Sequence, residues 1–261
     1  MMKIFMIGDI VGQSGRRALD QYLPQLKQKY GIDVVMGNGE NAAHGKGMTR
    51  RVYDELVFNG LSLISMGNHT FSKRELFDFI DEADRLVVPL NQPATLPGVG
   101  SRVIEDKGIR IRLTNLLGIT FMNGIVDNPF ACMDQLLSRI GKNEIHIVDF
   151  HAEATSEKLA LGHYLDGRVQ AVLGTHTHIQ TADERLLPKG TAYITDIGMT
   201  GPYDSIIGSD ISSILHKMTT GLAGRYQIAE GPAQFCGVIL DIDEVHYRVL
   251  NIERVYLRPE N

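Results

Sequence analysis

Short apolar runs, each followed at once by glycine or a polar residue, constrain the fold of this chain most strongly. The runs occupy residues 3–7, 33–36, 61–66, 144–150 and 169–173. Apolar runs of this length that are bounded by turn-forming residues are typical of strands buried on both faces. Because such strands need helices to cover them, we expect an α/β protein.

Helix signals separate the apolar runs. Helices are predicted at about residues 14–30, 50–59, 72–79, 130–140 and 156–165. Thr49 and Ser72 are the expected N-caps of two of them, because a hydroxyl at that position can accept a hydrogen bond from a free helical N–H. Pro24 lies inside the first helix, where a proline predicts a kink or a stop.

The remaining segments read as strands and turns. Residues 86–124 suggest mixed strands and loops, and residues 235–257 suggest a β-hairpin that turns near Asp243 and Glu244. The chain has 261 residues, of which 43% are hydrophobic and 22% charged, as in ordinary globular proteins. A chain of this length can form one large or two small domains. Since no repeat or linker interrupts it, we interpret residues 1–261 as one domain.

Composition also limits the partners. The formal net charge of −5 argues against a surface that binds duplex DNA, since such binding requires clustered Lys and Arg. Cys132 and Cys236 are the two cysteines, and their spacing suggests neither a disulfide framework nor a cysteine metal site. The apolar start breaks at Gly8, before a signal-peptide pattern develops. No run approaches the ~20 apolar residues of a membrane span. We expect a cytoplasmic protein that does not bind membranes.

Side chains that can bind metal ions follow the predicted strands. They are Asp9, Glu40, Asn41, Asn68, His69, His151, His176 and His178. Each alone has a plain structural explanation as a turn or cap residue. Open α/β sheets, however, place their sites at the carboxyl ends of strands, so the recurrence favours one shared site. Carboxylate, amide and imidazole together suit Mn, Fe or Zn in a two-metal hydrolytic site. His176 and His178, two residues apart on an extended chain, would point to the same side.

The same series resembles the motifs of the calcineurin-like metallophosphoesterases, which read D-x-H, GD, GNH[DE], H and GHxH. The matching segments are Gly8-Asp9, Gly39-Glu40-Asn41, Gly67-Asn68-His69-Thr70, His151 and Gly174-Thr175-His176-Thr177-His178. The chain departs from that pattern at Val11, where a histidine is usual, at Glu40, where an aspartate is usual, and at Thr70, where an acid is usual.

With residues 39–43, 149–158 and 195–202, these departures make the chain similar to the bacterial YmdB-type branch. The resemblance implies a four-layer α/β/β/α sandwich of two packed mixed sheets. It also implies a metal-dependent phosphodiesterase, with 2′,3′-cyclic nucleotides as a favoured substrate class.

The resemblance further implies a role for each residue. The implied ligands are Asp9, Asn41 and His178 for one metal ion, Asn68, His151 and His176 for the other, and Glu40 as the bridge between them. Asn41 would replace the histidine that is absent at Val11. A metal-bridging hydroxide would attack the phosphorus, and His69 would protonate the leaving oxygen as general acid. The two ions would be Fe or Mn, and Zn also suits these ligands.

Two other function classes stay open. One is a regulatory nucleotide-binding protein with weak turnover, and the other is a phosphomonoesterase or nuclease on the same scaffold. The basic pairs Arg16-Arg17, Arg50-Arg51 and Lys73-Arg74 are short, which favours small nucleotides or RNA ends over duplexes. Residues 196–202 either border the substrate or form a plain turn. The sequence is compatible with a homo-oligomer and leaves the oligomeric state open.

Overall fold

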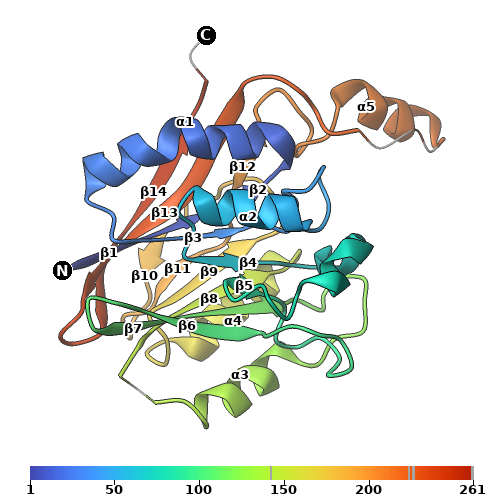
Figure 1. Cartoon of the computed structure of the whole chain (residues 1–261). Coiled ribbons are helices and arrows are strands. Elements are labelled where there is room, and N and C mark those ends of the chain that lie inside the picture. Colours follow the sequence, from blue (N-terminus) through green and yellow to red (C-terminus); the bar gives the residue numbers. More distant parts are fainter. Residues whose placement is uncertain (142, 223, 225–226, 260–261) are drawn as a thin grey trace.

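The computed structural model describes residues 1–141, 143–222, 224 and 227–259. Within these residues the strands form two mixed β-sheets, which pack face to face (Figure 1). The first sheet contains β1 (Met2–Ile7), β2 (Asp9–Ile10), β3 (Val34–Asn38), β4 (Leu63–Ser65), β5 (Leu86–Val87), β12 (Met199–Pro202), β13 (Ala233–Asp243) and β14 (Arg248–Leu257). The second contains β6 (Ser101–Asp106), β7 (Ile109–Leu117), β8 (Ile145–His151), β9 (Ala171–Thr175), β10 (Arg185–Leu186) and β11 (Ala192–Ile194).

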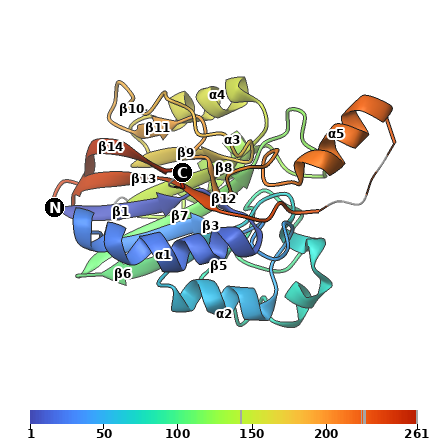
Figure 2. The same ribbon diagram turned by 90° about the horizontal axis from the view of Figure 1, so that it is seen from above.

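Helices cover the outer face of each sheet (Figures 1 and 2). The first sheet is covered by α1 (Gly12–Tyr30) and α2 (Arg50–Phe58), and the second by α3 (Pro129–Leu137) and α4 (Thr155–Leu165). α5 (Ile211–Thr220) extends away from the sandwich, and the short 3-10 helices η1 (Thr70–Ser72) and η2 (Arg74–Asp78) follow β4. This arrangement confirms the expected four-layer α/β/β/α order.

Parallel strands form the centre of both sheets. In the first sheet β1, β3, β4 and β5 run parallel in that order, and β13 joins the other side of β1 antiparallel. In the second sheet β7, β8, β9 and β11 run parallel in that order. The carboxyl ends of parallel neighbours lie along one edge of a sheet, so loops that follow these strands share that edge.

Alternate residues of a strand enter different cores. Along β1, Phe5 and Ile7 pack in the core beneath α1 and α2, whereas Ile4 and Met6 pack in the core between the two sheets. This follows from the two-residue period of a strand. All four side chains are fully buried, and each contributes roughly 1.5–3 kcal/mol through burial. A strand buried on both faces therefore reads as the continuous apolar run seen in the sequence.

Three local expectations have mixed outcomes. The Thr49 cap is confirmed, because its hydroxyl accepts from Val52 N at 3.3 Å. The prediction that the helix stops at Pro24 is wrong, since α1 continues through this residue to Tyr30. The apolar face of α1 packs on the first sheet, and this packing outweighs the backbone hydrogen bond that proline removes. The helix after Ser72 is also wrong in type. Two 3-10 helices occupy that segment, and no side-chain hydrogen bond from Ser72 caps either of them.

Other expectations concern the chain as a whole. The predicted hairpin is confirmed by the antiparallel pairing of β13 with β14. Cys132 and Cys236 are free, in line with the expected lack of a disulfide. Within the described ranges, no helix combines the length and the apolar character that a membrane crossing requires. We predicted one domain over residues 1–261. The last two of these residues, 260 and 261, lie outside the described residues.

Candidate metal centre

The structure brings together all the side chains that the sequence analysis selected. They lie where strands of the two sheets end: Asp9 two residues after β1, as the first residue of the short β2, Glu40 and Asn41 after β3, Asn68 and His69 after β4, His151 at the end of β8, and His176 and His178 after β9. The loops of the first sheet and of the second sheet thus contribute to one cluster. Asp9, Glu40 and His151 are almost completely buried.

His151 lies at the middle of one half of the cluster. Its Nε2 atom is 3.1 Å from Glu40 Oε1, 2.9 Å from Asn68 Oδ1 and 3.0 Å from His176 Nδ1. Ligand atoms of Glu40, His151 and His176 all lie within 4.8 Å of one another. A carboxylate, an amide oxygen and two imidazoles therefore converge on one small volume.

The other half contains Asp9, Asn41 and His178. His178 Nε2 lies 3.2 Å from Asn41 Nδ2 and 3.8 Å from Asp9 Oδ1. Asn41 Nδ2 also lies 3.1 Å from Glu40 Oε1, the same oxygen that contacts His151. Glu40 thus touches both halves. The amide of Asn41 presents its nitrogen here, and a half turn of the amide group presents Oδ1, the atom that can bind a metal ion.

The donors fit a metal ion. Asp9 Oδ1 is buried and has no hydrogen-bond partner among the described residues, and an unsatisfied buried carboxylate oxygen is costly. It faces two histidine nitrogens, at 3.8 Å in His178 and 3.9 Å in His151, distances too long for hydrogen bonds. A cation bound among these atoms would satisfy the carboxylate. Mixed oxygen and nitrogen donors of this kind suit Mn, Fe and Zn.

Gly67 allows the loop after β4 to approach the cluster. A Cβ atom at this position would lie 2.3 Å from Glu40 Oε2 and 2.6 Å from the ring of His151. No larger residue fits without moving one of these side chains. The approach also lets His69 N donate a hydrogen bond to Glu40 Oε2 at 3.0 Å, which fixes the second carboxylate oxygen.

The two histidines after β9 adopt a backbone that the sequence analysis did not expect. His176 has φ 100° and His178 has φ 66°, so the segment is a tight turn and the expectation of an extended chain is wrong. Both side chains reach the cluster nonetheless. Residues other than glycine at positive φ are strained and persist only where the surrounding structure holds them.

Charges in the cluster perturb each other strongly. Burial alone would raise the pKa of Glu40, but the neighbouring His151 lowers it to about 2. Burial alone would lower the pKa of His151, but the carboxylates of Glu40, Asp9 and Asp149 raise it to about 9. Burial raises the pKa of Asp9 to about 6 and lowers that of His176 to about 3. The carboxylates therefore draw positive charge into the cluster, which a proton on His151 or a metal ion can supply.

Two residues that the sequence analysis missed orient His151. Thr175 Oγ1 donates to Asp149 Oδ1 at 2.6 Å, so its oxygen is left to accept from His151 Nδ1 at 2.9 Å. With the proton on Nδ1, the neutral ring presents the lone pair of Nε2 to the cluster. A signal for Asp149 was present in the sequence: it is an acid inside an apolar run, two positions before His151 and therefore on the same side of the strand.

Glu153 is a third residue with an unexpected place. Its Oε2 lies 3.1 Å from His176 Nε2, on the opposite edge of the ring from the contact with His151. The second nitrogen of His176 thus has a carboxylate partner, as is usual for histidines that bind metals.

His69 lies beside the cluster and is half-buried. Its Nε2 is 3.5 Å from Asn68 Nδ2, and its Nδ1 is 3.4 Å from Ser72 Oγ. Burial lowers the pKa of His69, and the charge of Glu40 opposes this shift. Thr70, which replaces the usual acid, turns away and donates to Gly67 O at 2.6 Å. Ser72 is therefore the neighbour that can orient the ring.

A hollow of about 1190 Å³ lies at the start of α1. Gly12, Arg17, His44 and Ile228 are among the residues that line it. Gly12 N donates to the backbone carbonyl oxygen of Asn41 at 3.0 Å, so the hollow lies next to the loop that carries Asn41. The candidate ligands are not among its lining residues, so the hollow borders the loop that carries Asn41 and does not open onto the ligand atoms themselves.

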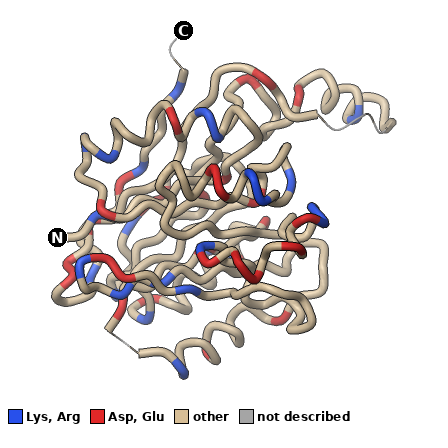
Figure 3. The backbone as a smooth tube through the Cα atoms, viewed as in Figure 1, with Lys and Arg blue, Asp and Glu red and all other residues tan. Residues whose placement is uncertain are grey.

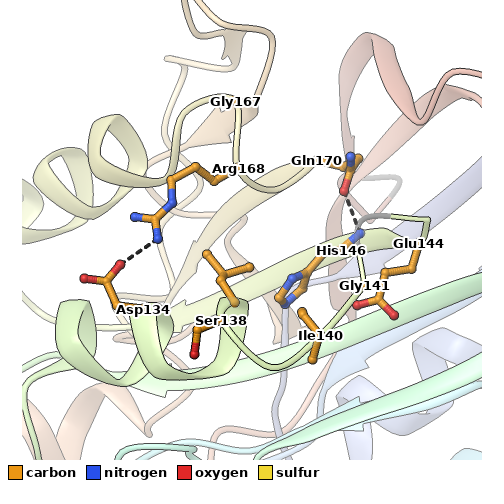
Figure 4. Close-up of a pocket in the computed structure, with 10 residues that line it drawn as sticks. Asp134, Ser138, Ile140, Gly141, Glu144, His146, Gly167, Arg168 and Gln170 are labelled. Atoms are coloured by element: carbon orange, nitrogen blue, oxygen red, sulfur yellow. Dashed lines mark hydrogen bonds and ion pairs between the residues drawn. The ribbon is translucent and has the colours of Figure 1, made fainter.

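A separate cavity of about 480 Å³ lies at the opposite end of β8, near the start of the strand (Figure 4). His146 lines it together with Arg168, which pairs with Asp134 at 2.6 Å, and with Gln170, whose Oε1 accepts from His146 N at 2.8 Å. Burial lowers the pKa of His146 to about 3. The ring is therefore neutral at neutral pH.

Comparisons with known proteins show the family and the fold of the chain. The model of one family, described as YmdB-like protein, matches residues 5–255. A Bacillus subtilis protein named 2′,3′-cyclic-nucleotide 2′-phosphodiesterase is 49% identical over 261 residues, which cover 100% of this chain and 98% of that protein.

Solved structures give the same picture. A hypothetical protein of Thermus thermophilus has a TM-score of 0.92 at 41% identity, covering 98% of this chain and 99% of that chain. A structure described as a novel phosphatase, from Mycoplasma pneumoniae, has a TM-score of 0.93 at 39% identity, covering 98% and 93%. An NAD nucleotidase of Haemophilus influenzae has a TM-score of 0.55 at 11% identity, covering 98% and 55%, and shares the fold alone.

Proposed function

Because the chain belongs to the YmdB-like family and has a metallophosphoesterase-like fold, we propose that it is a two-metal phosphodiesterase that hydrolyses 2′,3′-cyclic nucleotides. The family match confirms the resemblance inferred from the motifs. The observation that carries the proposal is the buried cluster around Glu40 and His151 at the edge shared by the two sheets.

The contacts support one assignment of the ligands. We assign Asp9, Asn41 and His178 to one ion, Asn68, His151 and His176 to the other, and Glu40 to both. Glu40 Oε1 contacts His151 on one side and Asn41 on the other, which is the position a bridging carboxylate needs. Fe or Mn is the proposed metal, with Zn as the third candidate, since the donor set suits all of them.

When bound, the ions would supply an activated water as nucleophile and positive charge for the phosphoryl oxygens. The protein's own residues do the rest. Asp149 and Thr175 hold the proton of His151 on Nδ1 and so keep Nε2 turned to the cluster. His69, half-buried beside Asn68, is placed to donate a proton to the leaving ribose oxygen. Ser72 Oγ lies at Nδ1 and the amide nitrogen of Asn68 lies 3.5 Å from Nε2, so a proton transfer from Nε2 requires the contact with Asn68 to open.

The surface favours a small substrate. The hollow beside the loop that carries Asn41 provides space for the nucleoside of a bound nucleotide, and Arg17 and His44 offer polar groups there. In the view of Figure 3, Lys and Arg alternate with Asp and Glu and do not form one continuous basic track. A long duplex would need such a track. Small cyclic nucleotides and RNA ends that carry a cyclic phosphate are therefore the proposed substrate class.

The test measures metal content and hydrolysis of 2′,3′-cyclic AMP on the same purified sample. The protein is treated with chelator and then supplied with Mn, Fe or Zn in separate arms. About two bound ions per chain, with hydrolysis lost on chelation and restored by a metal, would support the proposal. A simple diester and a phosphomonoester are compared in parallel. Bound metal without hydrolysis of any diester would overturn it in favour of a regulatory nucleotide-binding protein, and hydrolysis of the monoester alone would make the protein a phosphomonoesterase.

A further inference from the structure

A buried ion pair holds the strained turn that carries His176 and His178. Lys158 of α4 and Asp196, which follows β11, are 1% and 0% exposed and lie 2.9 Å apart, between Nζ and Oδ2. Neither residue is among the ligands assigned above. Both contact the backbone of the turn, however, at positions on either side of His176.

Lys158 holds the residue before His176. Its Nζ donates to the carbonyl oxygen of Thr175 at 2.7 Å. Asp196 holds the residue after it, since Oδ2 accepts from Thr177 N at 3.1 Å and from Thr177 Oγ1 at 2.8 Å. The peptide units that flank His176 are thus fixed by one cation and one anion that also neutralise each other.

Asp196 links this turn to a second part of the cluster. Its other oxygen, Oδ1, accepts from Gly198 N at 2.9 Å, and the carbonyl oxygen of Gly198 accepts from Asp9 N at 3.0 Å. One carboxylate therefore connects the backbone of Asp9 with the turn that separates His176 from His178. Residues from the two ends of the chain are placed relative to each other through a single side chain.

The pair is a costly way to stabilise a fold. Removing two charges from water opposes their attraction, so a buried ion pair often contributes no more than an apolar pair of the same size. The hydrogen bonds of the pair, in contrast, have no apolar substitute. An apolar pair could not bind the backbone groups Thr175 O, Thr177 N and Gly198 N. The turn needs such restraint, since His176 and His178 both have positive φ.

We propose that Lys158 and Asp196 are positioning residues that set the arrangement of His176, His178 and Asp9 for metal binding. The inference rests on the metal centre assigned under the proposed function. The sequence suggested that residues 196–202 either border the substrate or form a plain turn. For Asp196 we propose instead that it restrains the turn that carries His176 and His178.

The test measures the affinity for Mn by competition with a chelator, together with the melting temperature with and without metal. The variants are Asp196→Asn, Thr177→Val and the double variant Lys158→Met with Asp196→Asn. Single loss of either charge leaves its partner buried and unpaired, which can prevent folding. The double variant removes both charges, and Thr177→Val deletes one hydroxyl while keeping the backbone contact. We expect the folded variants to bind Mn about 10–100-fold more weakly, as for other partners of metal ligands.

A second buried ion pair provides the matched control. Arg112 Nη2 donates to Glu144 Oε2 at 3.1 Å near the start of β8, at the end of the strand away from His151. Their side chains are 10% and 4% exposed, and within the described residues neither contacts the turn or the ligands. The double variant Arg112→Met with Glu144→Gln removes both charges in the same way, and it should lower the melting temperature to the same extent with and without metal while leaving the Mn affinity at the wild-type value.

The outcomes separate the two proposals. A wild-type protein that binds no metal contradicts the proposed function itself. If the wild type binds Mn and both Thr177→Val and the double variant bind it equally well, the positioning role is wrong. The same conclusion holds if their loss of affinity only matches that of the Arg112→Met, Glu144→Gln control. Weaker binding confined to the variants around Asp196 supports the inference.

Discussion

The hydroxyl of Thr175 joins Asp149 to His151 inside the protein, so we can predict what its removal does. Thr175 is fully buried, and so are both partners. Its Oγ1 donates to Asp149 at 2.6 Å and accepts from His151 Nδ1 at 2.9 Å. The substitution Thr175→Val keeps the shape of the side chain and removes both hydrogen bonds.

The structure sets the size of the effect. A hydrogen bond to a charged group contributes about 1.5–3 kcal/mol, and a buried donor left without a partner costs about 1–3 kcal/mol. Asp149 retains Asn38, at 3.0 Å, and Ser65 as donors, whereas His151 Nδ1 keeps no neutral acceptor at hydrogen-bond distance in the described part of the chain. We therefore expect a loss of about 3 kcal/mol in unfolding free energy, or about 6–12 °C in melting temperature for a chain of this size. With the ring no longer oriented, metal affinity should fall about 10–100-fold.

The assay pairs this variant with Thr175→Ser. Serine keeps the hydroxyl and loses one buried methyl group, which costs about 1 kcal/mol of stability. Chemical unfolding gives the stability of both variants, and chelator competition gives their metal affinity. Both should be destabilised, but only Thr175→Val should bind metal weakly. Equal metal affinity in the two variants would show that Thr175 does not orient His151.

Three further predictions concern Glu40, His69 and His146. Glu40→Gln should reduce hydrolysis by more than about 10²-fold and lower metal content, because the residue contacts both halves of the cluster. His69→Ala should reduce kcat about 10²–10⁴-fold with metal content retained; equal metal loss in both variants would count against its role as an acid. Burial, with a smaller contribution from Arg112, lowers the pKa of His146 from 6.5 to about 3, so the stability that its neutral ring provides is complete above pH 6.5 and is lost as the pH falls towards 3. The free energy of unfolding of the wild type and of His146→Gln is measured with urea between pH 7 and 4.5. Below pH 6 that of the wild type should fall by roughly 1 kcal/mol per pH unit more than that of His146→Gln. Parallel pH dependences would refute the assignment.

Much of the fold could be predicted because its signals are local. A strand buried on both faces reads as an apolar run, and β1 with its alternating contacts to two cores shows why. Where the predictions were wrong, packing decided against local preference. α1 passes through Pro24 because its apolar face packs on the first sheet, and the segment after β4 forms 3-10 turns because His69 and Gly67 are drawn to Glu40.

The sequence by itself determined which side chains could form the site. Each candidate lies at the end of a strand or within a few residues of it, so the chemistry of the ligands and their common edge are properties of short segments. It did not determine how those side chains are held. Lys158 and Asp196 are far apart in the chain, as are Asp149 and Thr175, and their spacing carries no motif.

These partners become visible only when β8, β9 and the loop before β12 are packed together. The backbone of His176 and His178 is a further example, because a positive φ is uncommon for residues other than glycine and is held here by tertiary hydrogen bonds. The ligands of this centre were therefore encoded locally, whereas their orientation depends on contacts between distant segments, which exist only in the folded chain.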